Sequence, residues 1–416
     1  MKLKYGNEYQ ILDLPDEVPG IVLEGVQTEA IINPEEAVAE ALRNPIGSAP
    51  LREIVQAGES VCLLVNDSTR LARSDLFLPV LIEELNRSGI DRNNIFIQFT
   101  NGTHRPMDQE EMISIVGQES AGLVDMYNHD SGDADQLVFL GYTSFDTPVF
   151  VNKRVMQADR RILTGSVVHH FFAGFGGGRK ALVPGVAGWG TICQNHSLMF
   201  DQNARSGVLN GNPVHEDLVE GAMMAGGDFL LNTVLNADKN IIGIFAGDML
   251  KGHNAACEMV EKINGYKLDK LADVVIASCG GYPKDINLYQ AHKTLDNALA
   301  AMKPGGQLIL LAQCRDGVGS ALYEEWAGKY TDLNSLESAL KANFVLGGHK
   351  AYKVAKLLQK GKVHLVSDFD PDTARHFGFV PAASLEQAVE DVYSGNHNLL
   401  TYIIPQGSIV VPHYTG

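Results

Sequence analysis

Short apolar runs alternate with amphipathic segments along most of this chain, and this alternation constrains the fold more than any other feature. VCLLVND (61–67), NNIFIQFTNG (93–102) and RRILTGSVVHH (160–170) each have the composition of a buried strand. SDLFLPVLIEELNRSG (74–89) has the apolar spacing of a helix that ends at a glycine. Strands that alternate with helices predict an α/β fold with mostly parallel sheets.

The same alternation resumes after a polar connection near residues 263–272, which indicates a second domain. Because 416 residues exceed the size at which one hydrophobic core usually stops growing, two α/β domains are expected. We predict a cofactor-binding catalytic domain over 1–265 and a C-terminal α/β domain over 270–398, with an active-site cleft between them. The tail, 400–416, is expected to return to the first domain. The opening pieces KLKYG and QILDLPDE predict a short β-ribbon.

Composition excludes several classes of partner. The formal net charge of −17 argues against non-specific binding to nucleic acid or to an anionic membrane. No apolar run has the length of a signal peptide core or a membrane span. The five cysteines are scattered without a CxxC pair, which argues against a cysteine zinc site and indicates reduced thiols. We therefore expect a cytoplasmic protein that binds neither nucleic acid nor membrane.

Polar clusters follow three of the expected strands. DSTR (67–70), NGTHRP (101–106) and HHFFAGFGGGRK (169–180) each stand where a strand ends. In open parallel sheets, ligands bind beyond the carboxyl ends of the strands. The three clusters are therefore expected to share one pocket.

The glycine run in the third cluster resembles a phosphate loop but lacks its key residues. Arg179 stands where a Walker A loop or a dinucleotide fingerprint has its last glycine, and Ala181 offers no hydroxyl for magnesium. The run can still bring backbone N–H groups to a phosphate, with Arg179 adding charge. An apolar neighbourhood would make Lys180 nucleophilic. The alternative is a tight connection that carries a surface lysine.

Histidines form the second chemical signal. His169 and His170 are adjacent on a strand, so their side chains should face opposite ways and only one can easily enter the pocket. His104 lies between a strand and a helix, and His196 has helical spacing in TICQNHSLM. Histidine suits proton transfer near neutral pH and binding of a borderline metal. A structural role is the alternative for each of them.

Two further groups of side chains are candidates. The guanidinium of Arg70 matches a carboxylate or a phosphate, whereas Asp67 could simply cap the following helix. In the second domain, Tyr289 and Lys293 are four residues apart on a helix expected at about 287–302, and Gln290 and Lys293 are three apart. The alternative for these three is an ordinary solvated helix face.

Together the motifs DSTR, NGTHRP, HHFFAGFGGGRK, NHSLM, GNPVHED and YQAHK resemble the nickel-dependent lactate racemase family over nearly the whole chain. Leu71 departs from the pattern, because the family often has proline there. The resemblance implies an isomerase that racemises or epimerises lactate or a related 2-hydroxy acid. Its cofactor would be nickel held by a pyridinium dithiocarboxylate-type pincer nucleotide attached to a lysine, so cofactor-biosynthesis enzymes would be partners. The oligomeric state stays open.

The resemblance also implies a role for each matching residue. Lys180 would be the tethering lysine, His196 the nickel ligand, and His104 and His170 the paired acid and base. The substrate-binding residues would be Arg70, Gln290 and Lys293. The other cofactor-binding residues would be Asp67, Gly176, Gly177, Gly178, Arg179 and Tyr289. Hydride transfer to and from the pincer ring would pass through a 2-oxo acid, and one histidine would serve each substrate orientation.

Two other functions fit parts of the sequence. A zinc hydrolase would use His104, His170 and His196 as metal ligands and would not need Lys180. A non-catalytic protein that binds an anionic small molecule would use the same basic groups without changing the ligand.

Overall fold

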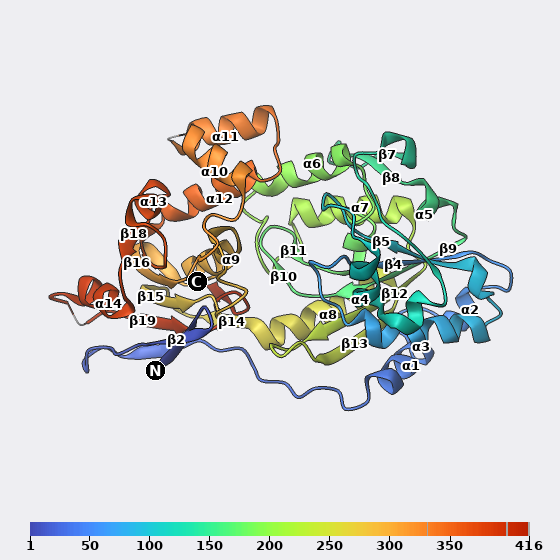
Figure 1. Ribbon diagram of the computed structural model, residues 1–416, viewed down its shortest axis with the longest axis horizontal. Coiled ribbons are helices and arrows are strands. Elements are labelled where there is room, and N and C mark those ends of the chain that lie inside the picture. Colours follow the sequence, from blue (N-terminus) through green and yellow to red (C-terminus); the bar gives the residue numbers. More distant parts are fainter. Residues whose placement is uncertain (331, 397, 415–416) are drawn as a thin grey trace. The chain divides into compact units, whose positions relative to one another are not determined.

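The computed structural model describes residues 1–330, 332–396 and 398–414, which form two compact units (Figure 1). Unit 1 comprises Met1–Val26 and Asn264–Gly416, and unit 2 comprises Gln27–Ile263. Each unit contains one six-stranded sheet, and nearly all neighbouring strands in the two sheets are parallel. The prediction of an α/β protein with two mostly parallel sheets in two domains is confirmed.

Unit 2 is built around the sheet that carries the three polar clusters. Its strands, in spatial order, are β13 (Ile241–Gly247), β12 (Phe229–Leu235), β9 (Arg160–Ser166), β4 (Val61–Val65), β5 (Ile95–Phe99) and β6 (Asp125–Tyr127). Within this six-stranded sheet, β12 and β13 pair in the antiparallel direction and the other neighbours are parallel. All five residues of β4 are buried, as expected for a central strand covered on both faces.

Helices cover this sheet with the apolar spacing that the sequence indicated. Side chains from α1 (Pro34–Arg43), α3 (Ser74–Arg87) and α4 (Gln109–Ala121) share one core with β4 and β5. α8 (Met249–Asn264) packs in a second cluster with Val167 and Phe175. Unit 2 also contains α2 (Leu51–Ile54), β7 (Leu137–Tyr142), β8 (Pro148–Asn152), α5 (Lys153–Gln157), α6 (Trp189–Ser197) and α7 (Pro213–Ala225).

The expected strand 160–170 is shorter than predicted. β9 ends at Ser166, and the chain then forms a two-residue hairpin of β10 (His169–His170) and β11 (Gly174–Phe175). Val167 still donates its N–H to the Thr233 carbonyl, but Val168 accepts from Gly176, which turns the chain back on itself. In the sequence, the apolar run extends beyond β9 because Val167 is also buried, in the same core cluster as Phe175 of the hairpin.

Unit 1 has an all-parallel sheet. Its order is β18 (Val380–Ala382), β17 (Gly361–Val366), β16 (Met302–Leu311), β15 (Ala272–Ser278), β19 (Thr401–Ile404) and β3 (Gly20–Val22). The predicted ribbon is present as β1 (Lys2–Tyr5) and β2 (Glu8–Ile11). The helices are α9 (Leu288–Ala300), α10 (Ala321–Lys329), α11 (Leu333–Ala342), α12 (Gly348–Leu358), α13 (Pro371–His376) and α14 (Leu385–Tyr393).

The domain boundaries differ from the predicted 1–265 and 270–398 at both ends of the chain. Residues 1–26 belong to unit 1, because β3 pairs with β19. The tail also stays in unit 1: β19 lies between β15 and β3, and β20 (Val411–Tyr414) pairs with β14 (Gly265–Leu268). All four residues of β19 are buried, so this strand needs a neighbour on each side. Residues 415 and 416 lie outside the described part.

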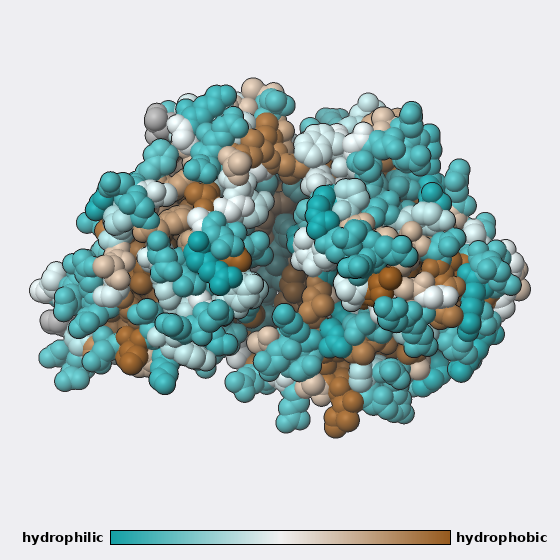
Figure 2. All heavy atoms as spheres, in the orientation of Figure 1, coloured by the Kyte–Doolittle hydropathy of each residue, from teal (hydrophilic) through white to brown (hydrophobic). Residues whose placement is uncertain are grey.

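The surface is largely hydrophilic (Figure 2). Hydrophilic residues cover most of the face seen in Figure 2, and the chain has 50 acidic against 33 basic residues. Within the described residues, no helix is both long enough and apolar enough to cross a membrane.

Candidate active site

The loop that carries DSTR is held at the carboxyl edge of the unit 2 sheet by three neighbouring strands. Asn66, just after β4, donates to the carbonyl of residue 70 at 3.3 Å. Ser166, at the end of β9, donates to the carbonyl of residue 71 at 2.7 Å, and Thr233 of β12 donates to that of residue 72 at 2.8 Å. Three consecutive carbonyls are thus fixed, which sets the direction of the side chains that precede them.

Asp67 and His104 form a close pair from two adjacent strand ends. Asp67 Oδ2 lies 2.5 Å from His104 Nδ1; the carboxyl group is 3% exposed and the imidazole 44%. A carboxylate only accepts, so Nδ1 carries the proton and Nε2 is the basic nitrogen. Burial alone would raise the pKa of Asp67, but the hydrogen bond and charge of His104 and the Thr69 hydroxyl hold it below its usual value. This geometry allows Asp67 to fix the orientation of the His104 ring.

Arg70 extends from the same loop. Its Nη1 donates to the carbonyl oxygen of Thr69 at 3.1 Å and to the hydroxyl of Thr69 at 3.0 Å. Its charge lowers the pKa of both His170 and Lys180, so the guanidinium lies close to the third polar cluster. The residue is exposed, which leaves it accessible to a ligand.

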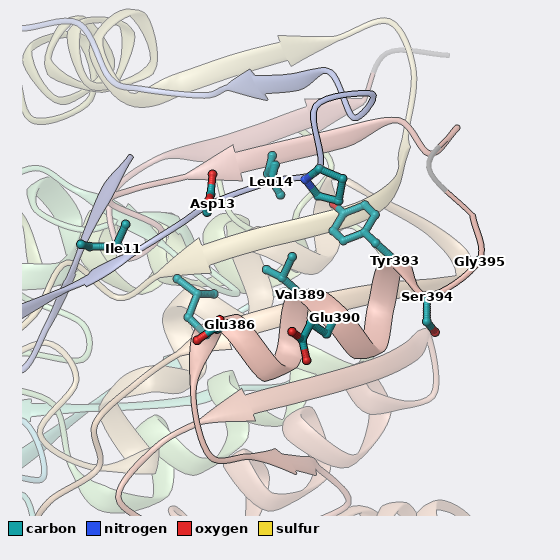
Figure 3. A pocket seen from close by; sticks show the side chains of 11 residues that line it. Ile11, Asp13, Leu14, Glu386, Val389, Glu390, Tyr393, Ser394 and Gly395 are labelled. Carbon is teal, nitrogen blue, oxygen red and sulfur yellow. The ribbon is translucent and has the colours of Figure 1, made fainter.

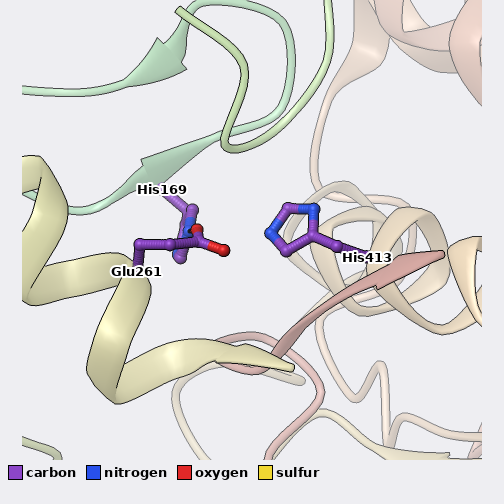
Figure 4. A group of neighbouring side chains, drawn as sticks. All are labelled: His169, Glu261 and His413. Atoms are coloured by element: carbon purple, nitrogen blue, oxygen red, sulfur yellow. Dashed lines mark hydrogen bonds and ion pairs between the residues drawn. The ribbon is translucent and has the colours of Figure 1, made fainter. Parts of the chain in front are cut away.

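The two adjacent histidines face opposite ways, as predicted. His169 Nε2 lies 3.0 Å from Glu261 Oε2 on α8, and Figure 4 shows these two side chains next to each other. His170 instead lies beside Phe172, with ring centroids 4.6 Å apart, and its Nδ1 accepts the N–H of Ala173 at 3.3 Å. A neutral imidazole that accepts at Nδ1 carries its proton on Nε2.

Phe172 is the centre of the cluster, and sequence reasoning gave it no role. Its ring is 4.6 Å from that of His170 and 4.8 Å from that of His196 on α6, and Lys180 Nζ lies 5.9 Å from its centroid. Phe172 is only 2% exposed. Three predicted site residues therefore surround one buried aromatic ring.

Asn212 explains the GNPVHED motif. This buried side chain donates to the carbonyl of Phe172 at 2.9 Å and accepts from Val214 at 3.1 Å, at the start of α7. It thus ties a helix N-terminus to the Phe172 backbone. The sequence signal was present, because asparagine before proline is typical of a helix start.

The backbone conformation and close packing of the loop require glycine at positions 177 and 178, independently of any ligand. Gly177 and Gly178 have φ of 72° and 56°, and a Cβ on Gly178 would lie 2.5 Å from Cγ of His253. Gly178 donates its N–H to Asn232 at 2.8 Å, and Gly176 donates to the Val168 carbonyl at 2.8 Å. The N–H groups at 176 and 178 are thus already bonded within the chain.

Arg179 points into the protein and not outward from the loop. It is fully buried, and its guanidinium donates to the Ala173 carbonyl at 2.9 Å and lies 3.1 Å from His253 Nε2. Burial lowers the pKa of Arg179 to about 10. The loop is therefore supported from beneath by a buried positive charge.

Lys180 and His170 are shifted toward their neutral forms. Burial, followed by the charges of Arg179 and Arg70, holds the pKa of Lys180 well below its usual value. Burial, followed by the charges of Lys180 and Arg70, does the same for His170. A neutral amine is nucleophilic, and a neutral imidazole can exchange a proton.

The unit 1 candidates lie together at the start of α9. Lys293 Nζ donates to Gln290 Oε1 at 3.3 Å, and the N–H of Gln290 is capped by Asn287. Lys350 of α12 places its Nζ 3.2 Å from the ring centroid of Tyr289. These side chains are close to one another, and their approach to a ligand stays a prediction.

A cavity of about 620 Å³ in unit 1 lies between residues 11–15 and α14 (Figure 3). None of the predicted site residues lines it. We place the candidate site in unit 2 because the hydrogen bonds, ring contacts and charges converge there, whereas this cavity has no such cluster of basic groups.

Comparison with known proteins agrees with this geometry. Residues 5–207 match the lactate racemase N-terminal domain, and residues 268–411 match the lactate racemase C-terminal domain. The chain belongs to the lactate racemase family. It is therefore a racemase, an isomerase, and membership of the family implies the nickel-pincer cofactor.

Individual relatives in the lactate racemase family match the chain nearly end to end. Lactate racemase of Thermoanaerobacterium thermosaccharolyticum is 32% identical, with 99% of this chain and 98% of the relative covered. That of Lactiplantibacillus plantarum is 34% identical, with 91% of each covered. The lactate racemase apoprotein structure from T. thermosaccharolyticum superposes with a TM-score of 0.90 at 31% identity, covering 99% of both chains.

Proposed function

We propose that this protein racemises or epimerises a small 2-hydroxy acid, lactate or a close relative, by hydride transfer with a nickel-pincer nucleotide tethered to Lys180. The observation that carries the proposal is the gathering of His170, His196 and Lys180 around Phe172. Arg70, from the same loop as Asp67, lowers the pKa of His170 and Lys180 and so connects this group with the Asp67–His104 pair. The curated relatives are lactate racemases, which supports the substrate class.

The residues present fit such a cofactor. Attachment through a lysine requires a neutral amine, and the burial of Lys180 together with the charges of Arg179 and Arg70 favours that form. His196 would be the nickel ligand, with its ring held edge-on against Phe172 at 4.8 Å. When bound, the cofactor supplies a reversible acceptor for the hydride at C2 of the substrate. Because the cofactor brings its own metal ligands, one protein imidazole is sufficient.

Proton transfer falls to the two histidines. The α-hydrogen next to a carboxylate is a very poor acid, so its loss as hydride, with loss of the hydroxyl proton, is the easier route to a 2-oxo acid. His104 presents a basic Nε2, because Nδ1 is bonded to Asp67, whereas His170 presents an N–H at Nε2. His104 Nε2 can thus accept the hydroxyl proton and return it from the imidazolium that forms, whereas the Nε2–H of the neutral His170 can donate a hydrogen bond to the substrate oxygen in the other orientation.

Arg70 would hold the substrate carboxylate while the planar intermediate turns. Gln290 and Lys293 would also bind the substrate, and Tyr289 would bind the cofactor. The loop residues Gly176, Gly177 and Gly178 would lie beside the nucleotide phosphate, and the buried Arg179 would contribute only its charge from beneath the loop. Of these, Gly176 leaves the most room, since the nearest atom to an added Cβ would be 3.6 Å away.

The zinc hydrolase alternative receives no support from the arrangement of the histidines. In the part of the chain that the structure describes, His104, His170 and His196 do not bring their ligand atoms within 4.8 Å of one another. A three-histidine zinc site requires ligand nitrogens about 2 Å from one ion, which places them closer together than this.

Intact-mass and metal analysis of protein co-produced with the cofactor-making enzymes tests the proposal. We expect one adduct at Lys180 and one nickel per chain, and conversion of one lactate enantiomer into the other by chiral chromatography. Lys180→Ala should lose the adduct, whereas His104→Ala should keep adduct and nickel but lose racemisation. Lys153→Ala, which changes an exposed lysine bonded to the Asp135 carbonyl, is the control. An unmodified Lys180 without nickel would refute the proposal.

A further inference from the structure

Thr69 lies at the centre of the first polar cluster and has no role in the function proposed above. Its hydroxyl donates to Asp67 Oδ1 at 2.8 Å and accepts from Arg70 Nη1 at 3.0 Å. The same oxygen lies 3.3 Å from His104 Nδ1, and the backbone N–H of Thr69 reaches Asp67 Oδ1 at 3.2 Å. One hydroxyl therefore contacts the three residues that would orient, bind and deprotonate the substrate.

Only a hydroxyl can make this set of contacts in so little space. A carboxylate only accepts hydrogen bonds and a guanidinium only donates them, whereas a hydroxyl donates once and accepts through two lone pairs. The proton on Oγ1 points to Asp67, so its lone pairs face Arg70 and the shared Nδ1 proton of His104. The three groups are thus joined without a direct ion pair between Asp67 and Arg70.

Because Arg70 does not pair directly with Asp67, part of its guanidinium stays available for a ligand. The hydrogen bonds of Arg70 to described residues use Nη1 alone, which leaves Nε and Nη2 for a two-pronged contact with a carboxylate. A direct pair with Asp67 would occupy that edge and neutralise the charge. Thr69 therefore anchors one nitrogen of the guanidinium and keeps the binding edge open.

We propose that Thr69 is a positioning residue that holds the Arg70 guanidinium at a set distance from Nε2 of His104. The substrate carboxylate on Arg70 and the substrate hydroxyl on His104 belong to adjacent carbons, so the two protein groups must keep a fixed spacing in the substrate orientation that His104 serves. The catalytic consequence rests on the proposed function, whereas the hydrogen-bond network does not.

Three variants separate the hydroxyl from the shape of the side chain. Thr69→Val keeps the shape and removes the hydroxyl, and Thr69→Ser keeps the hydroxyl. Ser68→Ala is the matched control, because the Ser68 hydroxyl makes no hydrogen bond with the residues that the structure describes. Thr69 is exposed, so its replacement leaves the core unchanged.

In the holoenzyme we expect Thr69→Val to lower kcat/KM by about 10- to 100-fold, with a higher KM and a lower kcat, because two hydrogen bonds to charged groups are lost. Thr69→Ser should return kcat/KM to within about threefold of the parent, and Ser68→Ala should leave it unchanged. A Thr69→Val enzyme within about twofold of the parent would overturn the inference, as would equal impairment in the Ser and Val variants.

A second readout needs no cofactor. In cofactor-free protein, the NMR order parameter of the Arg70 Nε–H bond should fall from roughly 0.8 to below about 0.6 in Thr69→Val and recover in Thr69→Ser. An unchanged order parameter would overturn the positioning role. If the parent holoenzyme racemises no 2-hydroxy acid, the proposed function fails, and this measurement still decides whether Thr69 anchors Arg70.

Discussion

Replacing Gly178 by alanine tests whether the glycine loop is shaped by its backbone. Gly178 has φ of 56°, where an alanine costs about 1 kcal/mol relative to glycine. Its added Cβ would lie 2.5 Å from Cγ of His253. The His253 ring cannot easily move, because its Nε2 lies 2.8 Å from the Gly176 carbonyl and 3.1 Å from Arg179. Overpacking of this kind adds about 1–3 kcal/mol, so we expect unit 2 to lose about 2–4 kcal/mol of unfolding free energy.

Gly176→Ala is the matched control in the same loop. Its added Cβ would meet nothing closer than 3.6 Å and its φ is not positive, so we expect a change of less than about 1 kcal/mol. The chain has two tryptophans, and a Trp326→Phe background leaves Trp189 of α6 as the reporter for unit 2. Urea unfolding followed by its fluorescence gives the comparison. Equal destabilisation by both substitutions would refute the argument from backbone shape.

Three other experiments, two with substitutions and one with chemical labelling, each test one residue of the site. The folded pKa of Asp67 lies below its ordinary 3.8, so its stabilising contribution is complete above that value and is lost as pH falls through the lower folded value. Asp67→Asn should therefore show a smaller fall in urea midpoint between about pH 6 and about pH 3 than the parent, and equal falls would contradict this. Competitive acetylation of the cofactor-free protein should give Lys180 a titration midpoint below 10.5, and a midpoint at or above that value would exclude a neutral-shifted amine. Thr233→Val removes a buried donor to the Ala72 carbonyl and should cost about 1–3 kcal/mol in the same urea assay; a cost below about 0.5 kcal/mol would show that the loop does not depend on it.

Much of the fold could be predicted because periodicity reports burial directly. The run 61–67 is apolar without alternation, and β4 is buried at every position in the centre of its sheet. The helix expected over 74–89 was found as α3, which ends at Arg87 shortly before a glycine in the left-handed region. What periodicity cannot report is which sheet a strand joins. The segment TYII is apolar enough to be buried in the sheet of either domain. Only its pairing with β15 and β3 assigns it to unit 1.

Part of the site could be predicted because the sequence shows which polar motifs follow parallel strands. DSTR and NGTHRP follow adjacent parallel strands, so their approach to one another follows from topology, and the Asp67–His104 contact agrees with it. Phe172 was missed because an aromatic residue inside a motif of histidines and glycines has the usual composition of a core position. The inward turn of Arg179 was missed because nothing in the glycine run indicates which way the guanidinium leaves the loop.

By itself, the sequence determined the two α/β domains and the residue types gathered at strand ends, because hydrophobic period and motif spacing are local properties of the chain. The tertiary structure alone decided the chemical state of those residues. The pKa of Lys180 is lowered by burial and by two arginines, one of them from a loop more than 100 positions away in the chain. Such a shift depends on distances and desolvation in three dimensions, which no spacing along the chain encodes.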